Sequence, residues 1–357
     1  MEPSRDDIFK ALERVIDPEL RRPVTELDMV RNVTVDGGRV EVTIALTVVG
    51  CPLRSSFEQQ IAEVMRDVPG VQTVGLSFDV MTPEERQALT TKLRGGVSAR
   101  SKGLSLDAST RVLAVCSGKG GVGKSTVAAN LATALSQLGQ RTGILDADVY
   151  GHSIPHILGI HQKPIAVDRM IVPPVKDELK LMSIGFFLDN NEPVMWRGPM
   201  LHRALEQFLS DVHWGELDVL VVDMPPGTGD VAISLGQLLP RAEAIVVTTP
   251  QPAAQEVAAR AGIMAQKTSM RLIGVIENMS GDVFGKGGGD ELATALGIPL
   301  LGRVVLDPLV RQCGDAGEPI ASAIPESATA EEFARIAQHV LELRSGAIVK
   351  PLTMVSR

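Results

Sequence analysis

Aromatic residues are scarce in this chain of 357 residues, which holds 8 Phe, 2 Trp and 1 Tyr. Proteins that stack the bases of single-stranded nucleic acids need repeated aromatic faces, so the composition disfavours that class. Basic residues are also in deficit, because 35 Lys and Arg stand against 43 Asp and Glu, a net charge of −8. Such a balance argues against a broad basic surface for phosphate backbones. We therefore expect no nucleic-acid partner.

Long hydrophobic runs and closely spaced cysteines are missing as well. No segment approaches the ~18 apolar residues that cross a bilayer, and the first residues lack a basic segment followed by an apolar one. The three cysteines, Cys51, Cys116 and Cys313, follow neither disulfide nor zinc spacing. These features predict a reduced, cytoplasmic protein without a membrane partner.

Length and charge divide the chain. A typical domain has about 100–200 residues, so two domains are expected. Residues 1–90 carry 16 acidic and 10 basic side chains, whereas residues 91–110 carry four basic and one acidic side chain and are rich in Gly and Ser. We predict a small domain over 1–90, a flexible basic linker over 91–110, a larger domain over 111–345 and a tail over 346–357.

The two domains differ in their expected secondary structure. The first is predicted to be a small α+β domain, with helices over 8–15 and 53–66 and strands over 33–35, 39–46 and 71–78. Asp36-Gly37-Gly38 is a hairpin signal between two of these strands. The second domain has β-branched apolar runs without alternation, typical of strands covered on both faces, at 111–116, 142–146, 217–223, 243–249 and 271–277. We predict an α/β fold with a mainly parallel sheet.

A glycine-rich loop follows the first strand of the second domain. Residues 117–126 read Ser-Gly-Lys-Gly-Gly-Val-Gly-Lys-Ser-Thr and precede a helix-competent run over 127–138. They fit the P-loop pattern, in which backbone N–H groups and a helix N-terminus hold phosphate. We expect Lys124 to contact the β/γ-phosphates of ATP and Ser125 to ligate Mg²⁺. The predicted nucleotide-binding residues of the loop are Gly118, Lys119, Gly120, Gly121, Val122, Gly123, Lys124, Ser125 and Thr126.

Polar residues end three of the later strands. Asp148 is a candidate to orient or deprotonate the attacking water and Asp146 to hold the Mg²⁺ shell, although either aspartate could instead serve a turn or helix cap. Asp223 fits the Walker B pattern and is expected to contact Mg²⁺ through water. The loop 227–229 that follows could sense the γ-phosphate. Asn278 either hydrogen-bonds the base edge or is a plain turn residue.

The second lysine of the loop carries a resemblance. Lys-Gly-Gly-Val-Gly-Lys, residues 119–124, resembles the deviant Walker A signature of the MinD/ParA and nitrogenase-iron-protein superfamily. This resemblance implies that Lys119 reaches the phosphates of the partner in a nucleotide-sandwiched homodimer, so Lys119, Lys124 and Asp148 form the expected catalytic set. The alternative for Lys119 is a solvated loop lysine.

Longer segments narrow the resemblance. Residues 146–156, 196–200, 223–230 and 277–280 look like the Mrp (ApbC) family of iron–sulfur cluster carrier ATPases. The segments Asp17-Pro18-Glu19-Leu20 and Gly50-Cys51-Pro52-Leu53 resemble the small domain of cytosolic iron–sulfur assembly factors. The resemblance implies a homodimer that hydrolyses ATP and binds an iron–sulfur cluster or delivers it to apo client proteins.

The cysteines depart from that family. Members with a bridging cluster have a Cys-x-x-Cys pair after the Asn-Met-Ser segment, whereas residues 280–290 contain no cysteine here. A cluster commonly needs four thiolates. Cys51 matches the reactive cysteine of the assembly-factor domain and is expected at a helix N-cap, where its thiol pKa would fall. It is a possible cluster ligand, or else a small buried apolar residue.

We expect no cluster-binding role for the other cysteine and histidine side chains considered next. Cys116 is expected in the core, which leaves Cys313, after a short helix, as the one thiol that the second domain could expose. His152, His156 and His161 are expected to be surface or nucleotide-edge residues rather than metal ligands.

Two other functions stay open. One is a nucleotide-switched scaffold that binds clients without its own cluster. The other is a positioning ATPase of the MinD/ParA kind, which is disfavoured because Gly346 and Pro351 break the terminal segment that would serve as a membrane helix. Residues 111–357 also sum to −5, which disfavours ParA-like DNA binding.

Overall fold

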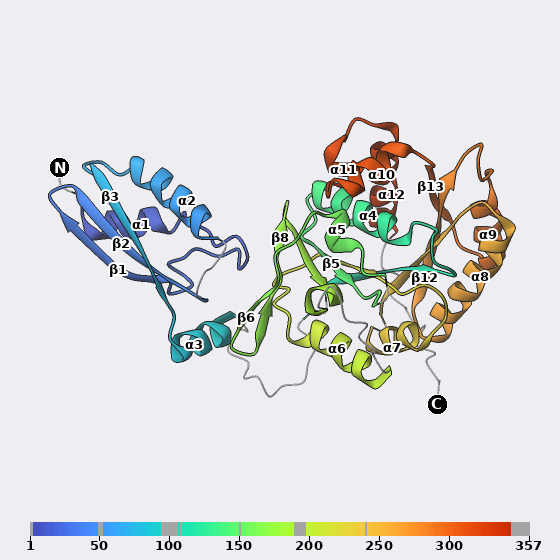
Figure 1. Cartoon of the computed structure of the whole chain (residues 1–357), viewed down its shortest axis with the longest axis horizontal. Coiled ribbons are helices and arrows are strands. Elements are labelled where there is room, and N and C mark those ends of the chain that lie inside the picture. Colours follow the sequence, from blue (N-terminus) through green and yellow to red (C-terminus); the bar gives the residue numbers. More distant parts are fainter. Residues whose placement is uncertain are drawn as a thin grey trace, which may run out of the picture. The chain divides into compact units, whose positions relative to one another are not determined.

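The computed structural model describes residues 3–48, 53–93, 106–107, 109–149, 151–188, 198–239 and 241–343. The chain divides into two compact units. Unit 1 comprises Met1–Thr110 and Ile160–Asp218, and unit 2 comprises Arg111–Gly159 and Val219–Arg357. None of the helices in the described ranges combines the length and hydropathy that a bilayer crossing requires. Figure 1 shows the elements of both units along the chain.

The N-terminal part of unit 1 has the predicted α+β character. Its elements are α1 (Arg5–Leu12), β1 (Val30–Asp36), β2 (Arg39–Leu46), α2 (Arg54–Arg66), β3 (Thr73–Val80) and α3 (Pro83–Leu93). The strands β1 and β2 form an antiparallel hairpin across Gly37 and Gly38, and β3 pairs parallel to β2. A capping box of Ser4 and Asp7 starts α1 three residues before the predicted helix. The helix α3 was not predicted, and it reaches three residues into the segment expected to be a linker.

The second part of unit 1 consists of short elements. They are β6 (Ile165–Val167), β7 (Met170–Val172), β8 (Val175–Lys176), β9 (Leu179–Ser183), the 3₁₀ helix η1 (Ile184–Phe187) and α6 (Gly198–Ser210). Val167, Met170 and Val172 join the hydrophobic core that α1, α2 and the β1–β3 sheet bury. In addition, the hydroxyl of Thr90 in α3 donates to the Val167 carbonyl at 3.3 Å. The β6–β7 hairpin is therefore part of the same core as the N-terminal elements.

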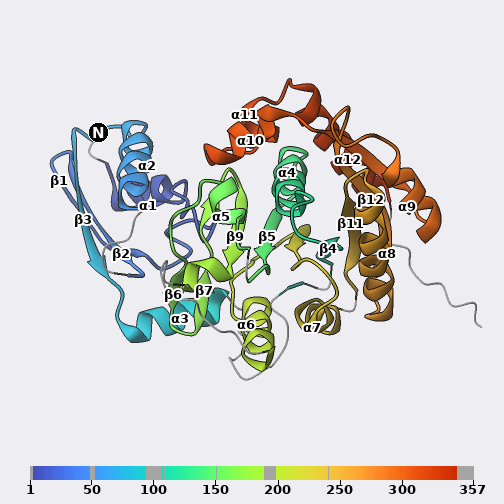
Figure 2. The ribbon, with the colours of Figure 1, turned by 45° about the vertical axis from the view of Figure 1, so that its right-hand side comes forward.

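Unit 2 is an α/β fold with a parallel sheet, as predicted. Its strands are β4 (Arg111–Ser117), β5 (Thr142–Asp146), β10 (Val219–Asp223), β11 (Glu243–Thr248), β12 (Arg271–Ser280) and β13 (Leu300–Val305). Its helices are α4 (Lys124–Gln137), α5 (Ile154–Ile157), α7 (Asp230–Leu238), α8 (Pro252–Lys267), α9 (Gly288–Leu296), α10 (Pro308–Asp315), α11 (Ile320–Ala323) and α12 (Ala328–Glu342). Figure 2 shows α4 and α7 on opposite sides of the sheet.

The strand order explains where a ligand can bind in unit 2. The strands run β13-β12-β11-β4-β10-β5, and all pairs among them are parallel. From β4 the chain crosses to β5 on one side, and from β10 it crosses back over β4 to β11. In open α/β sheets, ligands bind beyond the carboxyl ends of the strands where the winding direction reverses. That place in unit 2 is the end of β4.

Candidate functional site

Three strand ends meet at the end of β4. The backbone N–H of Met224 donates to the Val115 carbonyl at 3.1 Å, and that of Ala147 donates to the Asp223 carbonyl at 3.0 Å. The N–H of Gly227 donates to the Ser117 carbonyl at 2.8 Å. These bonds hold the segments after β5 and β10 against the phosphate loop (residues 117–124). Loop 227–229 therefore begins beside the phosphate loop, and its contact with a γ-phosphate stays a prediction.

The glycines of the phosphate loop differ in how much space surrounds them. A Cβ at Gly118 would lie 2.1 Å from the Val257 carbonyl carbon, and one at Gly123 would lie 2.2 Å from Asn278 Nδ2. Those positions are closed to any side chain. By contrast, a Cβ at Gly120 or Gly121 would meet nothing within 4 Å. Both ends of the loop therefore pack closely against neighbouring residues, whereas its middle has free space beside it. Gly123 is the N-cap of α4.

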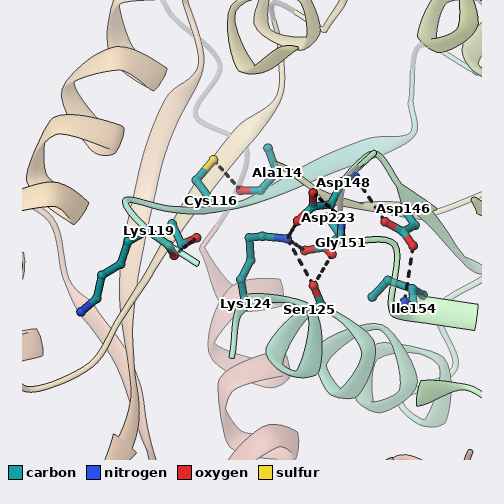
Figure 3. Close-up of polar contacts among 11 residues, drawn as sticks. Ala114, Cys116, Lys119, Lys124, Ser125, Asp146, Asp148, Gly151, Ile154 and Asp223 are labelled. Atoms are coloured by element: carbon teal, nitrogen blue, oxygen red, sulfur yellow. Dashed lines mark hydrogen bonds and ion pairs between the residues drawn. The ribbon is translucent and has the colours of Figure 1, made fainter. Parts of the chain in front are cut away.

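Lys124 is the centre of the polar cluster in Figure 3. Its ammonium Nζ lies 2.5 Å from Asp223 Oδ1, 3.5 Å from Asp148 Oδ2 and 3.3 Å from Ser125 Oγ. The residue is only 5% exposed. The attraction of two carboxylates offsets the cost of burying an ammonium group. This first residue of α4 therefore holds its ammonium group in a fixed position beside the phosphate loop.

Ser125 and Asp223 form an oxygen-rich pair next to Lys124. Ser125 Oγ donates to Asp223 Oδ2 at 2.6 Å. Complete burial raises the pKa of Asp223, against the opposing effects of Lys124 and of the hydrogen bond from Ser125. A hydroxyl and a carboxylate at a phosphate-binding loop are the hard oxygen donors that Mg²⁺ takes together with nucleotide phosphates. The residues present thus fit the predicted magnesium site.

The two aspartates after β5 have different surroundings. The Asp146 carboxylate accepts hydrogen bonds from the backbone N–H of Asp148 at 3.2 Å and of Ile154 at 3.4 Å. A turn aspartate makes contacts of this kind, and a contact of Asp146 with the Mg²⁺ shell stays a prediction. The Asp148 carboxylate accepts from the Gly151 N–H at 3.1 Å and also faces Lys124. Asp148 is therefore the one of the pair that contacts the lysine of the phosphate loop.

Lys119 stands apart from this cluster. Its side chain is exposed, and in Figure 3 it points away from Lys124. The Lys119 carbonyl accepts a hydrogen bond from Ser117 Oγ at 3.1 Å. Its ammonium group has no hydrogen bond or ion pair to any residue that the structure describes. Both interpretations of Lys119, a solvated lysine and a residue that reaches a partner, require an exposed side chain.

Asn278 lies against the phosphate loop. Its amide Nδ2 donates to the Val122 carbonyl at 2.9 Å, and the side chain is buried. The next residue, Met279, has a φ of 58°, in the left-handed region that a side chain rarely adopts. The end of β12 is thus shaped to support the loop. Contact of Asn278 with a base edge stays a prediction. Of the other predicted nucleotide-binding residues, Val122 is buried in the phosphate loop and Thr126 is half-buried in α4.

Glu277 is a site-proximal residue that the sequence did not single out. Its buried carboxylate accepts from the N–H of Gly289 at 2.6 Å and of Gly287 at 3.3 Å, at the start of α9. Glu277 therefore holds the end of segment 281–287 in place, directly beside Asn278, which contacts the phosphate loop. An acidic residue at the end of an apolar strand was the available signal.

The cysteines do not assemble a cluster site in the part of the chain that the structure describes. Cys51 lies outside the described residues. The helix that follows it begins at Arg54 with Leu53 as its N-cap, so the N-cap position expected for Cys51 is wrong. Burial raises the pKa of the Cys116 thiol to about 12. No group of three or more His, Cys, Asp or Glu side chains in the described ranges is placed to hold a metal ion.

Cys313 is buried, contrary to the expectation of an exposed thiol. It lies within α10 rather than after it and is 9% exposed. Burial raises the pKa of its thiol, and Asp307 and Glu318 act in the same direction. His152, His156 and His161 are exposed, as predicted.

The chain matches two known families. Residues 108–341 match the family described as NUBPL iron-transfer P-loop NTPase, and residues 5–76 match the family described as iron–sulfur cluster assembly protein. An iron–sulfur cluster carrier protein of Mycobacterium leprae is 51% identical over 349 residues, which cover 92% of this chain and 91% of that protein. One of Bacillus subtilis is 44% identical over 313 residues, covering 84% and 88%.

Solved structures agree with the fold. A nucleotide-binding protein of Archaeoglobus fulgidus in complex with ADP is 34% identical, with a TM-score of 0.52 over 62% of this chain and 91% of that one. MinD of Pyrococcus horikoshii, complexed with Mg-ADP, is 25% identical, with a TM-score of 0.53 over 67% of this chain and 100% of that one. The phosphate loop, its carboxylates and these similarities together show that this chain belongs to the iron–sulfur cluster carrier family of P-loop NTPases.

Proposed function

We propose that this protein binds Mg·ATP at the Lys124 site, hydrolyses it as a homodimer, and carries iron–sulfur clusters to apoproteins. The observation that carries the ATPase part is the contact of Lys124 with Asp223 and Asp148 at the end of the phosphate loop. It combines a cation for phosphate with two carboxylates, one beside the metal-ligating hydroxyl of Ser125. This set is what phosphoryl transfer to water requires.

Each residue has a distinct part in that reaction. Catalysis of phosphoryl transfer rests on positioning and charge stabilisation rather than on covalent chemistry. Lys124 and the backbone N–H groups of the phosphate loop hold the phosphates, and Ser125 and Asp223 are the residues that would hold Mg²⁺. That ion neutralises charge on the phosphate oxygens. Asp148 orients the attacking water and accepts its proton.

The homodimer part of the proposal depends on Lys119. Its exposed ammonium group points away from the Lys124 of its own chain, so it is available to the phosphates of a second copy. A cation supplied by a partner stabilises charge that develops in the transition state, as arginine fingers do.

The cargo part rests on family membership and on Cys51. Cys116 and Cys313 are buried with raised thiol pKa values, so neither is a ready thiolate. We propose that Cys51 supplies a cluster ligand together with thiols from outside the chain. The same burial, with the lack of cysteine in residues 280–290, favours a second candidate function, the nucleotide-switched scaffold without its own cluster.

Phosphate release from Mg·ATP by the full chain tests the ATPase proposal. Asp148→Asn should retain nucleotide binding and lower turnover by at least about 100-fold, a usual size for loss of a general base. Asp315→Asn is the matched control, because Asp315 is exposed and its ion-pair partner among the described residues is Arg311, also in α10. A parent that releases no phosphate, or an Asp148→Asn variant as active as the control, would refute the proposal.

A further inference from the structure

Unit 1 contains a small cavity with an unusual polar lining. The space open to the centre of a water-sized sphere is about 10 Å³, enough for one water or one small ion. Its polar lining residues are Asp17, Glu19 and Thr47, and Met29 also lines it. The other described lining residues are apolar, and most come from α2, the end of β2 and the β6–β7 hairpin. All of these residues belong to unit 1.

The polar groups around this cavity are incompletely paired. Asp17 Oδ1 accepts from the backbone N–H groups of Glu19 and Leu20, each at 2.9 Å. The residues Glu19 and Thr47 are each only 8% exposed. Within the described ranges, neither side chain has a hydrogen bond or an ion pair to another residue.

The nearest cations in sequence are engaged elsewhere. Arg21 pairs with Glu178, and Arg22 pairs with Glu26 at 2.8 Å. Burial and the neighbouring Asp17 raise the pKa of Glu19 to about 8. Burial also raises the pKa of Asp17. Two buried carboxyls without a positive partner are costly to ionise, and a bound cation would supply that partner.

We propose that the cavity between Asp17, Glu19 and Thr47 is a binding site for one small divalent cation of the Mn²⁺ and Fe²⁺ class. Carboxylate and hydroxyl oxygens are the ligands that such ions take in proteins. Ca²⁺ needs six to eight oxygens at longer distances, which a cavity of this size cannot supply. Mg²⁺ dehydrates reluctantly and usually keeps several waters, for which a cavity of this size has no room.

Occupancy would tie three segments of unit 1 together. Asp17 and Glu19 precede β1, Thr47 follows β2, and Val167 and Val172 bring the β6–β7 hairpin to the cavity wall. The inference goes beyond the nucleotide chemistry, because no residue of unit 2 takes part. Its failure would leave the ATPase proposal intact, and the reverse also holds.

The test is a titration of the metal-stripped, nucleotide-free full chain with Mn²⁺. Electron paramagnetic resonance measures binding as the loss of the signal of free Mn²⁺. An Asp223→Asn background removes the carboxylate of the phosphate-loop site. We expect one bound Mn²⁺ per chain in that background and at least tenfold weaker binding after Glu19→Gln. Glu13→Gln is the matched control, since Glu13 is an exposed acid at the end of α1 and should bind like the background.

Further variants make the result decisive. Glu19→Gln removes a buried ionisable group and should fold, which thermal unfolding checks. If it does not fold, Thr47→Val, for which we expect a similar loss of affinity, decides. Cys51→Ser in the same background should bind Mn²⁺ normally. Absence of Mn²⁺ binding into the millimolar range, as a cavity that holds only water would give, overturns the proposal. So does equal binding by Glu19→Gln and Glu13→Gln, or a loss confined to Cys51→Ser.

Discussion

The ammonium group of Lys124 and the carboxylate of Asp223 form a buried ion pair of 2.5 Å, in which Asp223 is fully buried. The lysine that the sequence assigns to nucleotide phosphates is therefore also the counter-ion of the Walker B carboxylate. Charge balance at the end of β4 and nucleotide binding depend on the same side chain. Changes at Lys124 should consequently affect both stability and binding, and the two effects can be separated.

Lys124→Ala should lower the free energy of unfolding by about 3–5 kcal/mol, because it leaves the buried Asp223 carboxylate without its positive partner. Adding Asp223→Asn should restore most of that stability, since the buried charge is removed, but it should not restore nucleotide binding. Urea denaturation and calorimetric titration with Mg·ATP measure the two quantities. Lys267→Ala, at an exposed lysine in the last turn of α8, is the control. A Lys124→Ala chain that binds ATP as tightly as this control would contradict the assignment.

Lys119→Ala should leave stability within about 0.5 kcal/mol of the parent, because the side chain is exposed and has no described partner. If Lys119 acts on the phosphates of a second copy, turnover should fall at least about 100-fold while nucleotide affinity changes little. Steady-state phosphate release and nucleotide titration check this pattern, with Lys267→Ala again as the control.

A mixed dimer tests whether Lys119 acts across subunits. In a dimer of one Lys119→Ala and one Lys124→Ala chain, the site with an intact Lys124 faces a partner with an intact Lys119. Mixing the two inactive variants should therefore return part of the activity. Failure to recover any activity in subunits shown to exchange would leave Lys119 as a solvated loop lysine.

Glu19 should make unit 1 less stable as pH rises. Burial, helped by the neighbouring Asp17, raises the pKa of the Glu19 carboxyl from the ordinary 4.5 to about 8, so the folded state keeps a proton that the unfolded state releases between these values. The free energy of unfolding should then fall as pH rises from 4.5 towards 8, by up to about 1.4 kcal/mol per pH unit. Burial also raises the pKa of Asp17, so its effect on stability has the same sign.

Chemical denaturation with a chelator present, across that range of pH, measures the effect. Glu19→Gln cannot titrate, so its stability should depend less on pH than that of the parent, whereas Glu13→Gln should keep the parent slope. An identical pH dependence for the parent and Glu19→Gln would show that Glu19 is not the titrating group.

The elements that the sequence predicted best are those with local signals. A buried apolar strand, a glycine loop and a helix N-terminus are contiguous in β4 and α4, and two consecutive glycines mark the β1–β2 turn. The strands β6 to β8 were missed because runs of two or three residues are too short to show a period. Their positions follow from the core that they join, which is a tertiary property.

The candidate site shows the same limit. Spacing brought Asp146 and Asp148 to the same strand end, but only the turn after β5 decides that Asp148 faces Lys124 while Asp146 binds backbone N–H groups. Glu19 was quoted from the sequence only as part of a resemblance, because its burial depends on α2 and the β6–β7 hairpin, which are remote in the chain. Burial of Cys313 within α10 was likewise invisible in the local pattern.

The thiols should differ sharply in their chemistry. Thiolates are the reactive and metal-binding form, and burial with a raised pKa disfavours that form at Cys116 and Cys313. Alkylation of the folded protein near neutral pH should therefore label Cys51 predominantly.

Anaerobic reconstitution with iron and sulfide should give a labile cluster. The Cys51→Ser variant should hold this cluster, or transfer it, less well than the parent. ATP turnover should not change in Cys51→Ser, whereas Cys313→Ser should match the parent in cluster content. Mass spectrometry of labelled peptides, iron and sulfide analysis and transfer to an apo-acceptor provide the measurements. Rapid labelling of Cys313, or undiminished transfer by Cys51→Ser, would refute the role proposed for Cys51 and favour the scaffold.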